Sequence, residues 1–228
     1  MLQILLEDNH LLAVDKPAGL LSQGDITGET NLLDQARAYL KTKYAKPGNV
    51  FVGLVHRLDR PTSGVVVLAR TTKGASRLSA QFRAGSVEKI YWAIVEGSCP
   101  SDEGEWRDTL LKDDIRNVVD VVPAGTPGAQ DAHLAYKVLG RAPRTSWIEV
   151  RPITGRSHQI RVQLASRGLP IVGDKRYNAR TSLQALDGKP RVALHARSLA
   201  FNHPTTKQLI TLTAELPADW PSHPRLDQ

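Results

Sequence analysis

One short stretch of the chain combines residue types that can do chemistry. Asp59 lies between Arg57 and Arg60 in the segment His-Arg-Leu-Asp-Arg-Pro-Thr-Ser-Gly of residues 56–64, just before a continuous apolar run at residues 65–69. An aspartate on a loop beside a buried strand is well placed to meet a ligand, and cations within about 4–6 Å would keep it ionised. The alternative is a surface ion pair, which contributes only about 0–1 kcal/mol to stability. The residue types alone leave both interpretations open.

Other kinds of reactive site find no support in the sequence. The chain contains no Gly-rich phosphate loop and no two histidines spaced four residues apart. A single cysteine, Cys99, and seven scattered histidines argue against a structural zinc site. We therefore expect a protein that uses neither a cofactor nor a metal ion.

The scaffold that positions Asp59 is predicted to be α/β, with strands outnumbering helices. Alternating or continuous apolar runs predict strands over residues 3–6, 11–15, 65–69, 88–96, 117–122, 132–139, 146–151, 197–202 and 208–214. Helices are predicted to begin at Thr30 or Asn31, at Thr72, and after Ser157, which can serve as a cap. Hairpin and crossover connections together predict a long mixed, mostly antiparallel sheet with flanking helices.

Domain organisation follows from length and loop composition. A chain of 228 residues suits one or two domains. The Gly- and Pro-rich loop at residues 123–128 is the one candidate seam. We expect a single domain over residues 1–228, with two subdomains meeting near residues 123–128 if it is divided.

Positive charge is concentrated in one part of the chain. Residues 137–197 hold thirteen Lys or Arg against three acids, a balance of +10, whereas the whole chain carries +7. Concentrated positive charge indicates a nucleic-acid partner, although a basic surface kept for solubility is the alternative. No apolar run approaches the ~20 residues that span a bilayer, and the N-terminus lacks a secretory signal. With one cysteine, these features predict a cytoplasmic protein that binds no membrane.

Several motifs resemble those of one enzyme family. His-Arg-Leu-Asp-x-x-Thr-Ser-Gly at residues 56–64 resembles the catalytic signature of the RluA-type pseudouridine synthases, which isomerise uridine in RNA. Similar motifs follow at Lys16-Pro17-x-Gly19, Glu88-Lys89-x-Tyr91, residues 154–162 (Thr-Gly-Arg-Ser-His-Gln-Ile-Arg-Val), Gly173-Asp174 and Leu194-His195-Ala196. The resemblance extends from about Ile4 to about Trp220, and several motifs in one order are more specific than any one of them.

The resemblance implies three residues for the reaction itself. Asp59 would be the catalytic carboxylate. Tyr91 would lie against the target base and serve in proton transfer, which agrees with its place on the strand face opposite Ile90 and Trp92. Arg161 would pair with Asp59 in a basic cleft that divides the expected pseudouridine synthase fold.

Further residues are expected to bind the substrate. The resemblance implies that Arg57 occupies the gap left by the flipped base and that Arg156 and His158, in the third motif, contact RNA. Arg176 and Arg180 lie in a polar stretch that reads as an exposed loop, so they are expected phosphate contacts. The predicted partner is a stem-loop of ribosomal or transfer RNA, bound by a monomer.

The chain departs from the family pattern in three ways. Gln163 stands where the family often has His, and His133 stands where a Thr is common. Both departures concern substrate contacts rather than chemistry. The sequence also begins directly at the catalytic region, so a short form without the N-terminal S4-like RNA-binding domain is expected.

Two other functions remain open on the sequence alone. A non-catalytic RNA-binding or RNA-folding module would satisfy the charge distribution, but it would not need the set of Asp59, Tyr91 and Arg161. A nucleoside hydrolase or nuclease would use a carboxylate with water or metal, and the chain has no carboxylate cluster suited to metal binding.

Overall fold

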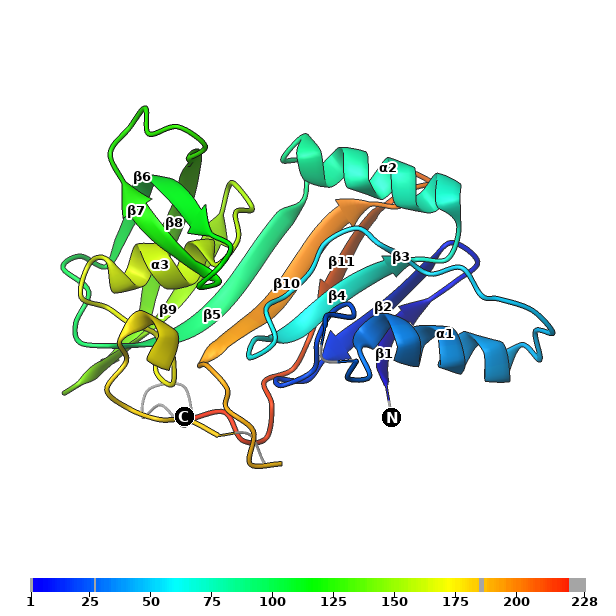
Figure 1. Cartoon of the computed structure of the whole chain (residues 1–228), viewed down its shortest axis with the longest axis horizontal. Helices are drawn as coiled ribbons and strands as arrows, with labels where there is room; N and C mark the ends of the chain where they lie inside the picture. Colours follow the sequence, from blue (N-terminus) through cyan, green and yellow to red (C-terminus); the bar gives the residue numbers. More distant parts are fainter. Residues whose placement is uncertain (1, 27, 185–186, 222–228) are drawn as a thin grey trace. The chain divides into compact units, whose positions relative to one another are not determined.

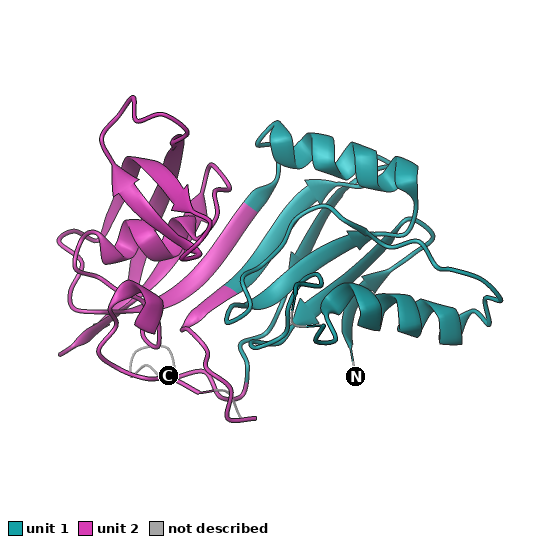
Figure 2. Ribbon diagram, in the orientation of Figure 1, with its two compact units in different colours: residues 1–88, 196–217 teal, residues 89–195, 218–228 magenta. Residues whose placement is uncertain are grey.

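The structure, a computed structural model, describes residues 2–26, 28–184 and 187–221. The chain forms two units, each built from two separate stretches (Figure 2). Unit 1 consists of residues 1–88 and 196–217, and unit 2 of residues 89–195 and 218–228. The loop at residues 123–128 lies inside unit 2.

Unit 1 is a strand assembly with two helices (Figure 1). Its strands are β1 (Gln3–Glu7), β2 (Leu11–Lys16), β3 (Gly53–Leu54), β4 (Ser63–Ala69), most of β10 (Leu194–Asn202) and β11 (Leu209–Thr213), and its helices are α1 (Leu32–Lys43) and α2 (Thr72–Arg83). The strand order is β1-β2-β4-β10, with β3 paired to β4 and β11 paired to β10. The pairs β1–β2, β2–β4, β3–β4 and β10–β11 are antiparallel.

The two helices of unit 1 begin at polar caps. The Asn31 side chain accepts a hydrogen bond from the Asp34 amide at 3.2 Å, and the Thr71 hydroxyl accepts one from Gly74 at 3.1 Å. The predicted starts of both helices are therefore confirmed, with Asn31 rather than Thr30 as the first cap.

The core of unit 1 fixes the strand that follows Asp59. Every residue of β4 is buried, as its apolar run predicts, so both faces of this strand are covered. Ala75, Leu78 and Phe82 of α2 pack on one face, in a cluster that includes Val65 and Val67. Burying each such side chain stabilises the fold by about 1.5–3 kcal/mol. The Asp59 loop therefore ends at a strand that the core holds rigidly.

Unit 2 is an antiparallel assembly covered by a short helix. Its elements are most of β5 (Glu88–Glu96), β6 (Glu103–Asp113), β7 (Val118–Val122), β8 (Gln130–Ala142), β9 (Thr145–Pro152), α3 (Gln159–Ala165) and the 3-10 helix η1 (Lys175–Tyr177). The strand order is β5-β9-β8-β6-β7, with every neighbouring pair antiparallel. Val162 of α3 and Tyr177 of η1 pack with Leu110, Val119 and Ala132 from the strands.

The fold class is mixed α/β with a mostly antiparallel sheet and few helices, as predicted. Two local predictions were wrong. Strand β6 was not predicted, and Ser157 does not cap α3, because His158 occupies that position in a left-handed conformation, with φ of 50°, and makes no capping hydrogen bond. Within the described ranges, no helix is long and apolar enough to cross a membrane.

Candidate active site

The Asp59 loop connects β3 to β4 and is anchored through its buried middle. Leu58 is buried, whereas Arg57 is exposed and Asp59 is half-buried. The Ser22 hydroxyl donates to the Leu58 carbonyl at 2.7 Å and accepts from the Leu58 amide at 3.2 Å. Because both the amide and the carbonyl of Leu58 are hydrogen-bonded, the backbone that carries the side chains of Arg57 and Asp59 is fixed in position.

Both ends of the loop are also fixed. His56 accepts a hydrogen bond at Nε2 from the Val67 amide at 2.9 Å, and its ring stacks on Phe82 with centroids 4.6 Å apart. At the other end, the Thr62 amide donates to the Asp59 carbonyl at 3.1 Å, which closes a turn. An aspartate on such a loop loses little conformational entropy when it engages a ligand.

Gly64 is required where the loop enters β4. Its φ is +114°, a region that residues with a side chain rarely adopt, and a Cβ atom there would overlap the Ala196 backbone.

The Asp15 carboxylate accepts a hydrogen bond from the Gly64 backbone. Burial raises the pKa of Asp15 to about 6, against the lowering effect of that hydrogen bond.

Arg60 joins the Asp59 loop to the turn that follows β2. The Arg60 carbonyl accepts from the Gly19 amide at 2.8 Å, and Arg60 Nε donates to the Gly19 carbonyl at 3.1 Å. Its two terminal nitrogens donate to both carboxylate oxygens of Glu29, at 3.0 and 2.7 Å. Of the two arginines that flank Asp59 in sequence, Arg60 is therefore engaged in holding the loop.

Lys16 lies buried beneath the same loop. Its side chain is fully inaccessible, and Nζ donates to the carbonyls of Pro17, Leu20 and Arg60 at 3.0, 2.7 and 3.3 Å. Burial lowers the pKa of Lys16 to about 7, while the charge of Asp59 acts in the opposite direction. In the sequence, Lys16 stood out only through the resemblance of Lys16-Pro17-x-Gly19 to a family motif, which gave it no role in the reaction.

In unit 2, Tyr91 projects from β5 beside Lys89. Both residues are half-buried, and the alternation of the strand places them on one face. Lys89 Nζ donates to the Thr154 carbonyl at 3.3 Å, and burial lowers the pKa of Lys89. This hydrogen bond ties the Tyr91 strand to the start of the loop at residues 154–158.

The side chain of Gln159 holds the loop at residues 154–158 in place. The buried Gln159 amide oxygen accepts from the Thr154 hydroxyl at 2.8 Å and from the Arg156 amide at 2.9 Å. Its nitrogen donates to the His133 carbonyl at 3.0 Å. One side chain thus orders the loop and links it to β8, which leaves the Arg156 side chain exposed at the surface.

Arg161 is held by a buried bidentate ion pair. Its Nε and Nη2 atoms donate to the two carboxylate oxygens of Asp174 at 2.7 and 2.8 Å, and only 5% of the Arg161 side chain is exposed. The guanidinium carbon lies 5.1 Å from the Tyr177 ring centroid. The Tyr177 hydroxyl is itself 2.8 Å from His158 Nδ1. A guanidinium with so little exposure is poorly suited to bind a phosphate at the surface.

The remaining predicted contacts lie at the surface of unit 2. Arg176 and Arg180 are exposed, as expected, and Arg176 Nη1 donates to the Asn117 carbonyl at 2.7 Å. The two residues that depart from the family pattern both make contacts within unit 2. Gln163 is fully buried and donates to Asp108 at 2.7 Å, and the His133 ring lies 2.8 Å from Glu105.

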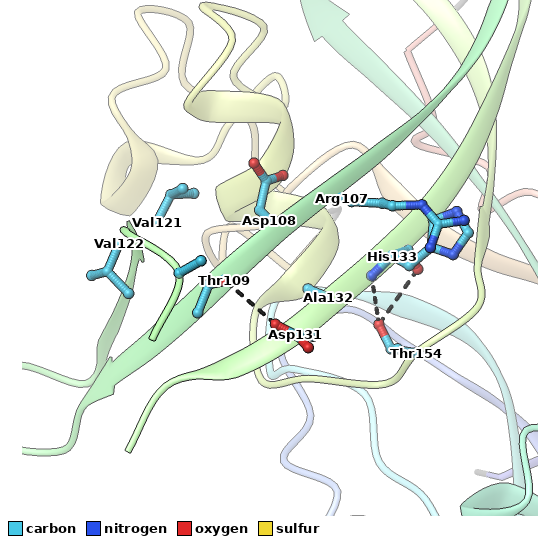
Figure 3. Close-up of a pocket in the computed structure, with 10 residues that line it drawn as sticks. Arg107, Asp108, Thr109, Val121, Val122, Asp131, Ala132, His133 and Thr154 are labelled. Atoms are coloured by element: carbon cyan, nitrogen blue, oxygen red, sulfur yellow. Dashed lines mark hydrogen bonds between the residues drawn. The ribbon is translucent and has the colours of Figure 1, made fainter. Parts of the chain in front are cut away.

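A pocket of about 410 Å³ opens beside the loop at residues 154–158, between β6, β7 and β8 (Figure 3). Asp131, His133 and Thr154 line one part of it, and Val121 and Val122 line another. The predicted catalytic residues do not line it. No group of His, Cys, Asp and Glu among the described residues is arranged to hold a metal ion.

The predicted residues fall into two sets. Asp59 and Arg57 belong to unit 1, whereas Tyr91, Arg161 and the other predicted RNA contacts belong to unit 2. Each set is ordered by contacts within its own unit. The pairing of Asp59 with Arg161 in a basic cleft remains a prediction.

Comparison with known proteins gives consistent matches. Residues 10–166 match the family model described as RNA pseudouridylate synthase. A ribosomal large subunit pseudouridine synthase C of Vibrio vulnificus is 35% identical over 222 residues, covering 93% of this chain and 65% of that relative. The dual-specificity RNA pseudouridine synthase RluA of Haemophilus influenzae is 36% identical over 219 residues, covering 94% and 93%. The chain thus spans just under two thirds of the first relative and nearly all of the second.

The fold is similar to that of solved structures as well. Human RNA pseudouridylate synthase domain containing 4 superposes with a TM-score of 0.78 at 28% identity, covering 95% of this chain and 89% of that one. Human RNA pseudouridylate synthase domain containing 1 has a TM-score of 0.72 at 23% identity, covering 95% and 84%, and supports the fold alone.

Proposed function

Because this chain belongs to the family of RNA pseudouridylate synthases, we propose that it isomerises uridine to pseudouridine within RNA. The observation that carries the proposal is the loop at residues 56–64, which presents half-buried Asp59 from a backbone anchored by Ser22, Gly19 and Lys16. A loop held this firmly suits a residue that acts on a bound substrate rather than a residue in a solvated surface pair.

The reaction breaks the bond between uracil N1 and ribose C1′ and makes a bond between C5 and C1′. The proton on C5 is lost and N1 gains one, so the base needs a group that transfers protons. Asp59, as a carboxylate, attacks C1′ or removes a ribose proton, and Tyr91 lies against the base and serves in proton transfer. Arg161 pairs with Asp59 and holds the carboxylate in position.

The target uridine must leave its stack before these atoms can be reached, which costs a few kcal/mol. Arg57 fills the vacated position, and its exposure next to anchored Leu58 supports this role. Arg156, His158, Arg176 and Arg180 contact the RNA. Three of these four are exposed arginines of unit 2, which agrees with the excess of positive charge at residues 137–197.

The substrate is a stem-loop of ribosomal or transfer RNA. One group of relatives is named for the ribosomal large subunit, and another is named for dual specificity towards RNA. The protein works as a monomer in the cytoplasm, where its single thiol, the buried free Cys99, would stay reduced. Light scattering after size-exclusion chromatography tests the monomer.

Release of tritium from RNA that contains 5-³H-uridine tests the activity. Turnover with intact strands and without free uracil is expected. Binding without tritium release would instead indicate a non-catalytic RNA-binding module, and strand scission or free base would indicate a nuclease or hydrolase. Separate ribosomal and transfer RNA stem-loops in the same assay identify the substrate.

A further inference from the structure

We propose that Asp174 is a positioning residue for the isomerisation: it acts through Arg161, whose guanidinium it fixes at Nε and Nη2 against the Tyr177 ring. The proposal rests on the proposed function. It assigns a role to a buried carboxylate that lies on a turn outside α3 and is not among the residues proposed for the reaction.

The first support is the geometry of the ion pair. Two parallel hydrogen bonds between Arg161 and Asp174 fix both the distance and the plane of the guanidinium, which a single contact cannot do. Both side chains are almost completely buried, with 5% and 1% exposed. In such a pair the cost of desolvation largely cancels the attraction, so its presence is weak evidence for a stabilising role. A fixed cation is the property that the pair supplies reliably.

The second support is that Asp174 is itself held by its backbone. Its amide donates to the Ile171 carbonyl at 2.9 Å, and its carbonyl accepts from Tyr177 at 3.0 Å and Ala179 at 3.1 Å. Gly173, just before it, has a φ of +88°, and a Cβ atom there would overlap the Arg191 carbonyl. The chain therefore needs glycine here to bring the carboxylate into place.

The third support is the ring behind the guanidinium. Tyr177 is buried, and its hydroxyl accepts a hydrogen bond from the Val119 amide at 3.0 Å and contacts His158 Nδ1 at 2.8 Å. The ring can therefore neither swing away nor rotate out of the core. With Asp174 at its edge and Tyr177 at its face, Arg161 has both in-plane and out-of-plane restraint.

Unit 2 contains a matched control for this arrangement. Arg167 donates from Nη1 and Nη2 to the two oxygens of Asp108 at 2.9 and 3.1 Å, and its guanidinium carbon lies 4.6 Å from the Trp106 ring. The control pair is thus also bidentate and also packs on an aromatic ring, although Arg167 binds through its two terminal nitrogens and Arg161 through Nε and Nη2. It is more exposed, and neither partner belongs to the proposed catalytic set.

The test compares Asp174→Asn with Asp108→Asn in the tritium-release assay, with thermal melting of each variant as a check of folding. Asp174→Asn should lower kcat about 10- to 100-fold and change KM less than threefold, whereas Asp108→Asn should leave kcat within twofold of the wild type. Asp174→Glu keeps the charge on a longer side chain and should recover part of the lost kcat. If Asp174→Asn does not fold, the kcat of Asp174→Glu is compared with that of the wild type instead.

A double-mutant cycle tests whether Asp174 acts through Arg161. If it does, adding Asp174→Asn to Arg161→Ala should lower kcat no further than Arg161→Ala alone. The proposal is overturned if both Asp174 variants retain wild-type kcat, or if the Asp174→Asn effect is equally large with and without Arg161. Lack of turnover in the wild type would overturn the proposed function and this proposal together, so the wild-type rate distinguishes the two failures.

Discussion

The Lys16 ammonium donates a hydrogen bond to the carbonyl of Arg60, the residue that follows Asp59, from a position that water does not reach. This contact joins the end of β2 to the Asp59 loop across 44 positions of sequence. It also places an ionisable group in the core of unit 1, which makes the stability of the fold depend on pH.

Lys16→Met should change how stability varies with pH. The pKa of Lys16 is lowered from 10.5 to about 7 in the folded protein, so between these values the unfolded chain binds more protons than the folded one. The stability of the wild type relative to the variant should therefore rise from pH 7 to pH 10, by at most about 1.4 kcal/mol per unit. Urea unfolding of both proteins at pH 6.5, 8 and 9.5 measures the difference, and a constant difference would contradict the account.

Glu7 should also make stability rise with pH, but in the acidic range between about pH 2 and pH 4.5. Its carboxylate is largely buried and accepts hydrogen bonds from Lys43, Tyr44 and Tyr39, at 2.7, 2.6 and 2.7 Å. Desolvation alone would raise its pKa, but these bonds lower it from 4.5 to about 2.

Glu7→Gln should therefore destabilise the protein by about 1–2 kcal/mol at pH 7. The stabilisation is present above about pH 4.5 and is lost as the pH falls towards 2, so the melting temperatures of variant and wild type should converge in acid. Exposed Glu103→Gln serves as the control and should leave melting unchanged. Curves for wild type and Glu7→Gln that stay parallel down to pH 2.5 would be inconsistent with this role.

Arg161→Ala should lower kcat by about tenfold or more, because the proposed ion pair with Asp59 is lost, and should change RNA affinity less than about threefold, because only 5% of the Arg161 side chain is exposed. Single-turnover tritium release measures the rate, and filter binding measures the affinity. A wild-type kcat together with weaker RNA binding would instead make Arg161 a phosphate contact.

Changing both Arg176 and Arg180 to Ala should weaken the salt dependence of RNA binding. If about four to six cations meet phosphates, log affinity falls against log salt with a slope near −3 to −5. The double variant should flatten this slope by about 1–2 units and raise KM, with little change in kcat. Arg37 and Arg83, two exposed arginines of unit 1, provide the matched control. If both double variants have the wild-type slope, the RNA lies elsewhere.

Much of the fold could be predicted because local signals agreed with the final structure. The continuous apolar run predicted the buried strand β4, and polar capping residues predicted the starts of α1 and α2. Strand β6 was missed because its inward positions include Gly104 and Asp108, which break the alternation of apolar and polar residues. Asp108 is tolerated there because Arg167 and Gln163 bind its carboxylate, and both lie more than 50 residues away in sequence.

The site could be predicted only in part, for a similar reason. Motifs single out Asp59, Tyr91 and Arg161, but the contacts that hold them join distant segments. Ser157 was the expected cap of α3 from residue type alone, whereas the structure uses His158, whose ring contacts Tyr177. The hydrogen bonds that Arg161 donates to Asp174 likewise depend on a turn that local patterns do not specify.

The most direct test of the account is tritium release by Asp59→Asn from 5-³H-uridine RNA. The substitution removes the ionised carboxylate and nearly preserves the size of the side chain, so the anchored loop should keep its structure. Isomerisation should be abolished, while RNA affinity stays within about tenfold of the wild type, because one charge changes phosphate binding little. Measurable turnover by this variant would contradict the assignment of Asp59 as the catalytic carboxylate.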